Sequence, residues 1–116
     1  MKIDDYNLTN DAKFLISSMY KEYLSRLKDN SPKRSAVFFR NSESIHRLMP
    51  EWSKEDTDYT VEELIDKGLL KGQPVLGGYL DITLTTDAVA MLQMSFKDKI
   101  DIVLDYATKI KNLIIP

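Results

Sequence analysis

Apolar residues recur every three or four positions between Asp11 and Leu27. This spacing is typical of an amphipathic helix, which buries one stripe of its side chains. Thr9 or Asn10 is suited to cap the helix, and the DNSP sequence that starts at Asp29 ends it. The stripe predicted to be buried consists of Ala12, Leu15, Ile16, Met19, Tyr20, Tyr23, Leu24 and Leu27.

Two short helices are predicted next. Ser31 followed by Pro32 favours a helix start, with serine as the cap and proline in the first turn. A second start lies at Asn41 or Ser42, and that helix ends before Pro50. The residues predicted to be buried are Ala36, Val37 and Phe38 or Phe39 in the first helix, and Ile45, Leu48 and Met49 in the second.

A fourth helix is predicted to begin at the SKED sequence, in which Ser53 and Asp56 have the spacing of a capping motif. It ends at Lys67 and Gly68, since a cation suits the negative end of the helix dipole and glycine readily adopts a left-handed conformation. Its apolar face contains Thr57, Val61, Leu64 and Ile65.

A β-hairpin follows this helix. Leu69 and Leu70 begin the first strand, and apolar residues alternate with polar ones along YLDITL, the period of a half-buried strand. Gly77 and Gly78 suit a tight turn, whereas Pro74 indicates an edge strand or a longer loop.

One long helix is predicted over residues 86–114, capped by Thr85 or Thr86. Its apolar positions keep one phase over about 28 residues, although a break near Ser95 is an alternative. The C-terminal half of such a helix needs a partner, either helix 11–27 or a second copy of the chain. The apolar stripe consists of Val89, Leu92, Phe96, Ile100, Val103, Ala107, Ile110 and Ile114.

The composition indicates one globular domain over residues 1–116, with 43% apolar and 29% charged residues. The chain has no cysteine, which excludes disulfides, thiolate zinc sites and cysteine nucleophiles. No apolar run approaches the ~18 residues that a membrane span requires. We therefore expect a cytoplasmic protein with no membrane partner.

Several sequence phrases resemble those of winged-helix proteins. They are LTNDAKFLISSMYKEYLSR, MPEWSKED, LIDKGLL and ITLTTDAVAML, and together they cover most of the chain. The chain is similar to small, poorly characterised winged-helix proteins of Gram-positive bacteria and their phages, including the YjcQ-like proteins. The resemblance implies a mostly α fold with a small β-hairpin, a winged helix-turn-helix with a long C-terminal helix. It implies no catalytic activity, and it leaves DNA binding and protein interaction both open.

The charge of helix 54–67 bears on that choice, because the resemblance places it where a winged helix reads DNA. Its two lysines face six carboxylates, a net charge of −4, and residues 72–80 of the hairpin carry no charge. Phosphates would repel such a helix. Protein contact is therefore favoured, through Tyr59, Thr60 and Glu63 or through the neutral hairpin.

A basic patch at residues 33–47 supports the alternative of a DNA-binding transcriptional regulator. Its candidate nucleic-acid contacts are Lys33, Arg34, Arg40 and Arg47, which face Glu43 alone and leave a local charge of +3. The same residues are also typical of the solvated surface of two short helices. An affinity for duplex DNA that falls steeply as the salt concentration rises would support the DNA-binding interpretation.

No catalytic, cofactor-binding or metal site is predicted. His46 is the only histidine, and a lone histidine forms neither a catalytic triad nor a metal site. Asp56 and Asp58 lack the glycine and the closing glutamate of a calcium loop. We expect a non-enzymatic regulatory or interaction module, whose partner is a protein or a second copy bound through the C-terminal helix.

Overall fold

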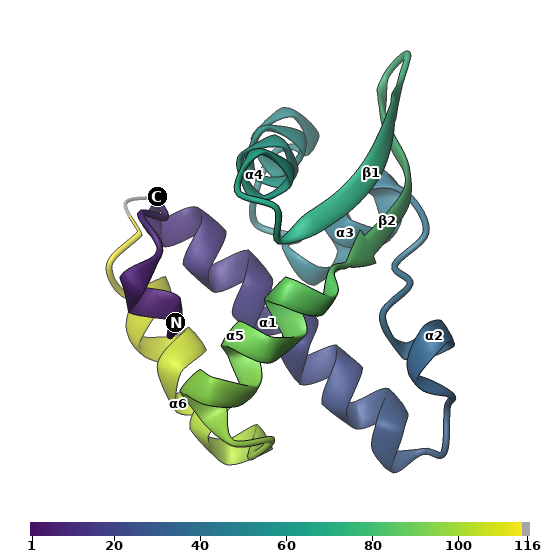
Figure 1. The fold of residues 1–116 in the computed structure, drawn as a ribbon. Helices are drawn as coiled ribbons and strands as arrows, with labels where there is room; N and C mark the ends of the chain where they lie inside the picture. Colours follow the sequence, from purple (N-terminus) through teal and green to yellow (C-terminus); the bar gives the residue numbers. More distant parts are fainter. Residues whose placement is uncertain (115–116) are drawn as a thin grey trace.

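The computed structural model describes residues 1–114 and is mostly helical, with one small antiparallel hairpin, as the sequence predicts (Figure 1). Residues 115–116, the end of the domain predicted over 1–116, lie outside the described residues. The elements are η1 (Ile3–Asp5), α1 (Asn10–Lys28), α2 (Lys33–Ala36), α3 (Ser42–Leu48), α4 (Lys54–Asp66), β1 (Leu70–Val75), β2 (Gly78–Leu84), α5 (Thr86–Phe96) and α6 (Ile100–Lys111). None of the helices in residues 1–114 has both the length and the apolar character needed to cross a bilayer.

Side-chain caps begin most of the longer helices. The side chains of Thr9, Asn41, Ser53 and Thr85 each accept a backbone N–H from the first turn, which confirms the predicted starts of α1, α3, α4 and α5. The prediction that Ser31 caps α2 is wrong. Its N–H donates to the Arg26 carbonyl at 2.9 Å, so Ser31 belongs to the turn that ends α1.

The hairpin joins β1 to β2 through Leu76 and Gly77, with Leu70 opposite Leu84 and Val75 opposite Gly78. Residues 37–40 hydrogen-bond to the other edge of β2. The Phe39 N–H donates to the Ile82 carbonyl at 2.7 Å, and the Ile82 N–H donates to the Arg40 carbonyl at 2.9 Å. Strand β2 is therefore held from both sides.

The core lies around α1, which runs diagonally through Figure 1 with α4 and the hairpin above it and α5 and α6 below. Seven of the eight residues predicted for its buried stripe are buried, and only Leu27 is half-buried. Residues from η1, α3, α4, β2, α5 and α6 pack into the same core cluster.

The prediction of one continuous helix over 86–114 is wrong. Helix α5 ends at Phe96 and α6 begins at Ile100, so the alternative of a break near Ser95 describes the structure better. Lys97 and Asp98 between the helices have φ angles of 52° and 56°, which turn the chain out of the helix. The turn lets α6 fold back along α1, where Val103, Ala107 and Ile110 are buried.

Aromatic contacts stabilise this turn. The ring of Phe96 stacks on Tyr20 of α1, with ring centroids 6.1 Å apart, and meets the edge of Tyr106 at 5.1 Å. The Tyr20 hydroxyl donates a hydrogen bond to Asp98. Because α1 covers the apolar stripe of α6, that stripe is not free to pair with a second copy of the chain.

Candidate functional site

One candidate site lies where the hairpin projects beside α4 (Figure 1). A shallow groove of about 660 Å³ separates the two elements, and we call it the α4–hairpin groove. Its residues are Lys54, Glu55, Asp58, Tyr59 and Glu62 of α4, and Pro74, Val75, Gly77, Gly78 and Tyr79 of the hairpin.

Contacts with α3 and α4 fix the position of the hairpin. Lys54 Nζ lies 3.2 Å from Asp58 Oδ2 and also donates to the Gly77 carbonyl, which ties α4 to the turn. The Ser42 hydroxyl accepts the Tyr79 N–H at 2.8 Å. A Cβ at Gly78 would lie 2.5 Å from that hydroxyl, so close packing on α3 depends on glycine at this position.

The exposed side chains of this region include an aromatic, an aliphatic and two acidic residues. Tyr59 is 74% exposed and Leu76 at the turn is fully exposed. Glu55 and Glu62 are also exposed. Exposed aromatic and aliphatic side chains beside charged ones are typical of protein contact surfaces.

Two residues of the predicted protein-contact face lie elsewhere. Thr60 is only 3% exposed, and its hydroxyl donates to the Asp56 carbonyl at 2.8 Å. Glu63 accepts hydrogen bonds from the Thr9 N–H and hydroxyl at 2.8 and 2.6 Å. These residues join α4 to its own first turn and to α1, so of the predicted face only Tyr59 is strongly exposed. Sequence reasoning did not single out Leu76, although its place beside Gly77 in a tight turn indicates exposure.

The four residues of the predicted basic patch are exposed, but they line two different concave surfaces. Arg40 and Arg47 line one of about 530 Å³. Lys33 and Arg34 line a second groove of about 1190 Å³, which also contains Lys71 of β1. The structure therefore divides the patch that the sequence predicts.

Arg26 lies beside Arg40 and Arg47, although the sequence places it in α1. Its guanidinium donates to the Phe38 carbonyl at 2.8 Å and lies 4.3 Å from the centre of the Phe39 ring. Glu22 pairs with it at 3.4 Å. Arg26 therefore stabilises the chain around residues 36–39 and adds little free positive charge to this surface.

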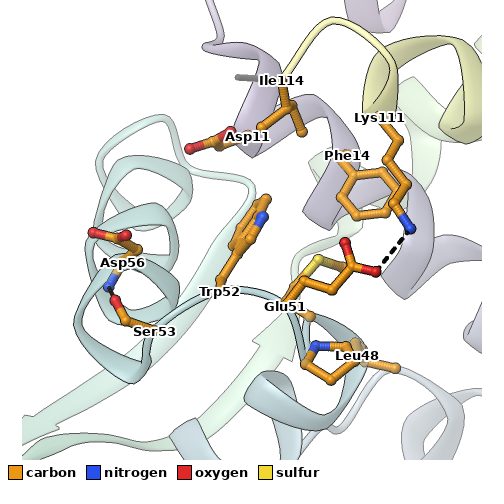
Figure 2. Close-up of a pocket in the computed structure, with 11 residues that line it drawn as sticks. Asp11, Phe14, Leu48, Glu51, Trp52, Ser53, Asp56, Lys111 and Ile114 are labelled. Carbon is orange, nitrogen blue, oxygen red and sulfur yellow. Dashed lines mark hydrogen bonds and ion pairs between the residues drawn. The ribbon is translucent and has the colours of Figure 1, made fainter. Parts of the chain in front are cut away.

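A second candidate site is a pocket of about 360 Å³ between the start of α1, the connection from α3 to α4, and the end of α6 (Figure 2). We call it the Trp52 pocket. Its lining residues are Asp11, Phe14, Leu48, Met49, Pro50, Glu51, Trp52, Ser53, Asp56, Lys111 and Ile114. Sequence reasoning places Trp52 in a connection but predicts no pocket, because the lining residues are far apart along the chain.

The lone histidine supports this pocket. His46 Nε2 lies 2.7 Å from the carbonyl oxygen of Trp52, which fixes the connection from α3 to α4. Across the pocket, Lys111 pairs with Glu51 at 3.4 Å.

Burial raises the pKa of Asp11, and the negative charges of Asp56 and Glu63 raise it further. Asp11 is therefore a carboxylate held under electrostatic repulsion at the edge of a cavity.

Comparison with known proteins finds no match: no family model, no curated protein and no solved structure matches this chain. In the part of the chain that the structure describes, no three histidine or acidic side chains are grouped so that they could hold a metal ion. The α4–hairpin groove, the Trp52 pocket and the concave surface lined by Arg40 and Arg47 are the features on which the proposals below are based.

Proposed function

We propose that this chain is a non-enzymatic winged-helix module, which binds a protein partner through the α4–hairpin groove and the hairpin turn. The order of its elements supports the winged-helix assignment. Helix α1, the segment 37–40, α3, α4 and the two strands follow one another as in that fold, and residues 37–40 pair with the edge of β2. In that arrangement α4 occupies the position of the recognition helix.

The observation that carries the protein-binding proposal is the chemistry of this face. Exposed Tyr59 is of a residue type that is enriched among the residues that dominate protein interfaces, and exposed Leu76 adds apolar area. Glu55 and Glu62 lie beside them, and the hairpin contributes no cation between Gly72 and Leu80. A duplex in this position would bring phosphates close to Glu55 and Glu62, and the one lysine of the groove, Lys54, is already paired with Asp58. A protein with an apolar contact patch surrounded by basic residues fits the face better.

DNA binding through residues 33–47 is the second candidate function. One observation favours it, since Arg40 and Arg47 are both exposed and line the same concave surface. The division of the patch opposes it, because Lys33 and Arg34 line a different groove. A regulator of this type would touch phosphates with two arginines rather than with four cations.

Site-specific crosslinking in cells tests the protein-binding proposal. A photo-crosslinking benzoylphenylalanine replaces Tyr59 or Leu76 in separate variants, and Lys109 on the exposed side of α6 serves as the matched control position. We expect one adduct of defined mass from positions 59 and 76 and none from position 109. Equal adducts from all three positions, or none from 59 and 76, would overturn the proposal.

A further inference from the structure

The Trp52 pocket lies outside the proposed protein-binding face and has the features of a small-ligand site. Its volume of about 360 Å³ falls within the range of ~300 to 1,000 Å³ that is usual for such sites. Residues of α1, α3, α4 and α6 and of the connection from α3 to α4 form its walls, so that it is a concave cavity rather than a gap along one helix.

Two aromatic rings, those of Phe14 and Trp52, line the pocket. The centroids of the Phe14 and Trp52 rings are 6.0 Å apart, and the ring planes are tilted by 58°. Figure 2 shows Trp52 between the carboxylate of Asp56 and the ring of Phe14. The face of an aromatic ring carries partial negative charge and attracts organic cations, and tryptophan does so most strongly.

The carboxylates at the pocket add a second source of attraction for cations. Glu51 is paired with Lys111, whereas Asp11 and Asp56 form no ion pair with any residue in 1–114. Both lie in the first turn of a helix, where a carboxylate favours the positive end of the dipole. The pKa of Asp11 is nevertheless raised, first by burial and then by repulsion from Asp56 and Glu63. A cation bound between them would reduce the repulsion.

We infer that the Trp52 pocket binds a small organic cation, an amine or a guanidine attached to an aromatic or apolar group. The carboxylates of Asp11 and Asp56 balance its charge, and the rings of Trp52 and Phe14 contact its apolar part. Inorganic metal ions do not fit as well, since within the described residues the carboxylates are not grouped with a third ligand.

A charge series of ligands tests this inference on the unmodified protein. Phenethylamine, phenethyl alcohol and phenylacetate share one aromatic group and differ in charge. Trp52 is the only tryptophan, so its indole N–H gives a single NMR signal that reports on the pocket. We expect the amine to shift this signal saturably, with a Kd of about 1 mM for a ligand of this size. The alcohol should bind at least about fivefold more weakly, since it lacks the charge, and phenylacetate should not bind.

Two variants locate the charge effect. Asp11→Asn combined with Asp56→Asn should weaken phenethylamine binding at least about fivefold, whereas Asp87→Asn should leave it unchanged. Asp87 is a matched control because it also lies in the first turn of a helix, α5, and does not line the pocket. Equal affinity for amine and alcohol, no saturable shift, or the same loss from Asp87→Asn would overturn the inference.

Discussion

Helix α4 presents carboxylates on two of its faces, and the two faces differ in what lies opposite them. Toward the hairpin, Asp58 and Glu62 face a neutral turn across a shallow, open groove. Toward α1, Asp56 lies beside a pocket that Phe14 and Trp52 help to line. In the sequence, the carboxylates of both faces belong to one acidic segment. The two faces therefore differ in what surrounds their carboxylates, and on this difference rest the two proposals of a protein contact at the groove and a small cation in the pocket.

The two regions also differ in how they are held. Neighbouring segments form the groove, and the hairpin turn is positioned by Lys54 and by the contact between Gly78 and Ser42. Residues from both ends of the described chain form the pocket, from Asp11 to Ile114. A change in the hairpin should therefore alter the groove and leave the pocket intact. The predictions below test that independence.

The largest expected effect is that of Gly78→Ala. The new Cβ would clash with the Ser42 hydroxyl at 2.5 Å, and φ at this position is 150°. We expect the free energy of unfolding to fall by about 2 to 3 kcal/mol, measured by chemical denaturation. Gly77→Ala is the matched control, because its φ is 86° but no atom lies within 4 Å of the added Cβ. It should cost only about 1 kcal/mol.

The NMR signal of Trp52 shows whether Gly78→Ala also affects the Trp52 pocket. The indole signal of Trp52 and its shift with phenethylamine should be unchanged in folded Gly78→Ala protein. An equal loss of stability in both glycine variants would show that the contact with Ser42 does not matter. A lost response at Trp52 would show that groove and pocket are coupled.

A smaller loss is expected from Glu63→Ala, which affects the side of α4 that faces α1. The change removes two hydrogen bonds to Thr9, and we expect a loss of about 1 to 2 kcal/mol in the free energy of unfolding. It also removes one of the charges that raise the pKa of Asp11, which should therefore fall in an NMR titration. Exposed Glu62→Ala is the control and should stay within about 0.5 kcal/mol. Equal effects of the two variants would contradict the role of Glu63.

A weaker effect is expected in the pH dependence of stability. The pKa of Asp11 in the folded protein lies above its usual value of 3.8, so the folded state binds this proton more tightly than the unfolded chain. The contribution of Asp11 to stability is greatest below that value and decreases as pH rises through the folded pKa. Unfolding measured over a pH series should show this decrease in the parent protein and in Asp87→Asn, but not in Asp11→Asn.

Protonation of Asp11 should also change the affinity of the Trp52 pocket for phenethylamine. Phenethylamine binding should weaken as pH falls through the folded pKa of Asp11, because protonation removes one of its two counter-charges. Binding that does not change with pH, or that strengthens in acid, would argue against a role for Asp11.

The smallest effect is expected when a DNA duplex is added to the protein. A duplex titrated at low salt should give no measurable binding to the parent protein. The double variant with Arg40→Ala and Arg47→Ala should give the same result in this titration. Binding that weakens steeply with salt, and less steeply in the arginine variant, would shift the functional site from the α4–hairpin groove to the surface that these arginines line.

Local signals account for most of the secondary structure that sequence reasoning predicted correctly. Thr9, Asn41, Ser53 and Thr85 cap helices because a side-chain oxygen reaches an N–H only a few residues away. The hairpin forms around Gly77, whose positive φ is open to glycine at little cost. Ser31 does not cap α2 because the helix begins one residue later than predicted, which puts Pro32 at the N-cap position.

The candidate sites were less accessible to sequence reasoning. Tyr59 and Thr60 were both predicted to lie on a contact face. Tyr59 is exposed, but Thr60, one position further, is buried, since the helix turns by about 100° per residue. Lys33 and Arg47 belong to one basic segment of sequence and line different surfaces of the molecule. The charges were visible in the sequence, but the surface that each charge faces was not.

The sequence alone was enough to predict the hairpin, the starts of α1, α3, α4 and α5, and the acidic character of α4, because these follow from backbone preferences and composition. The tertiary structure decided the break at residues 97–99, the burial of α6 on α1, and the assembly of the Trp52 pocket. An apolar period is the same for one long helix and for two helices that fold back. The choice between them depends on burial against residues such as Tyr20, which are distant in sequence and adjacent only in the folded chain.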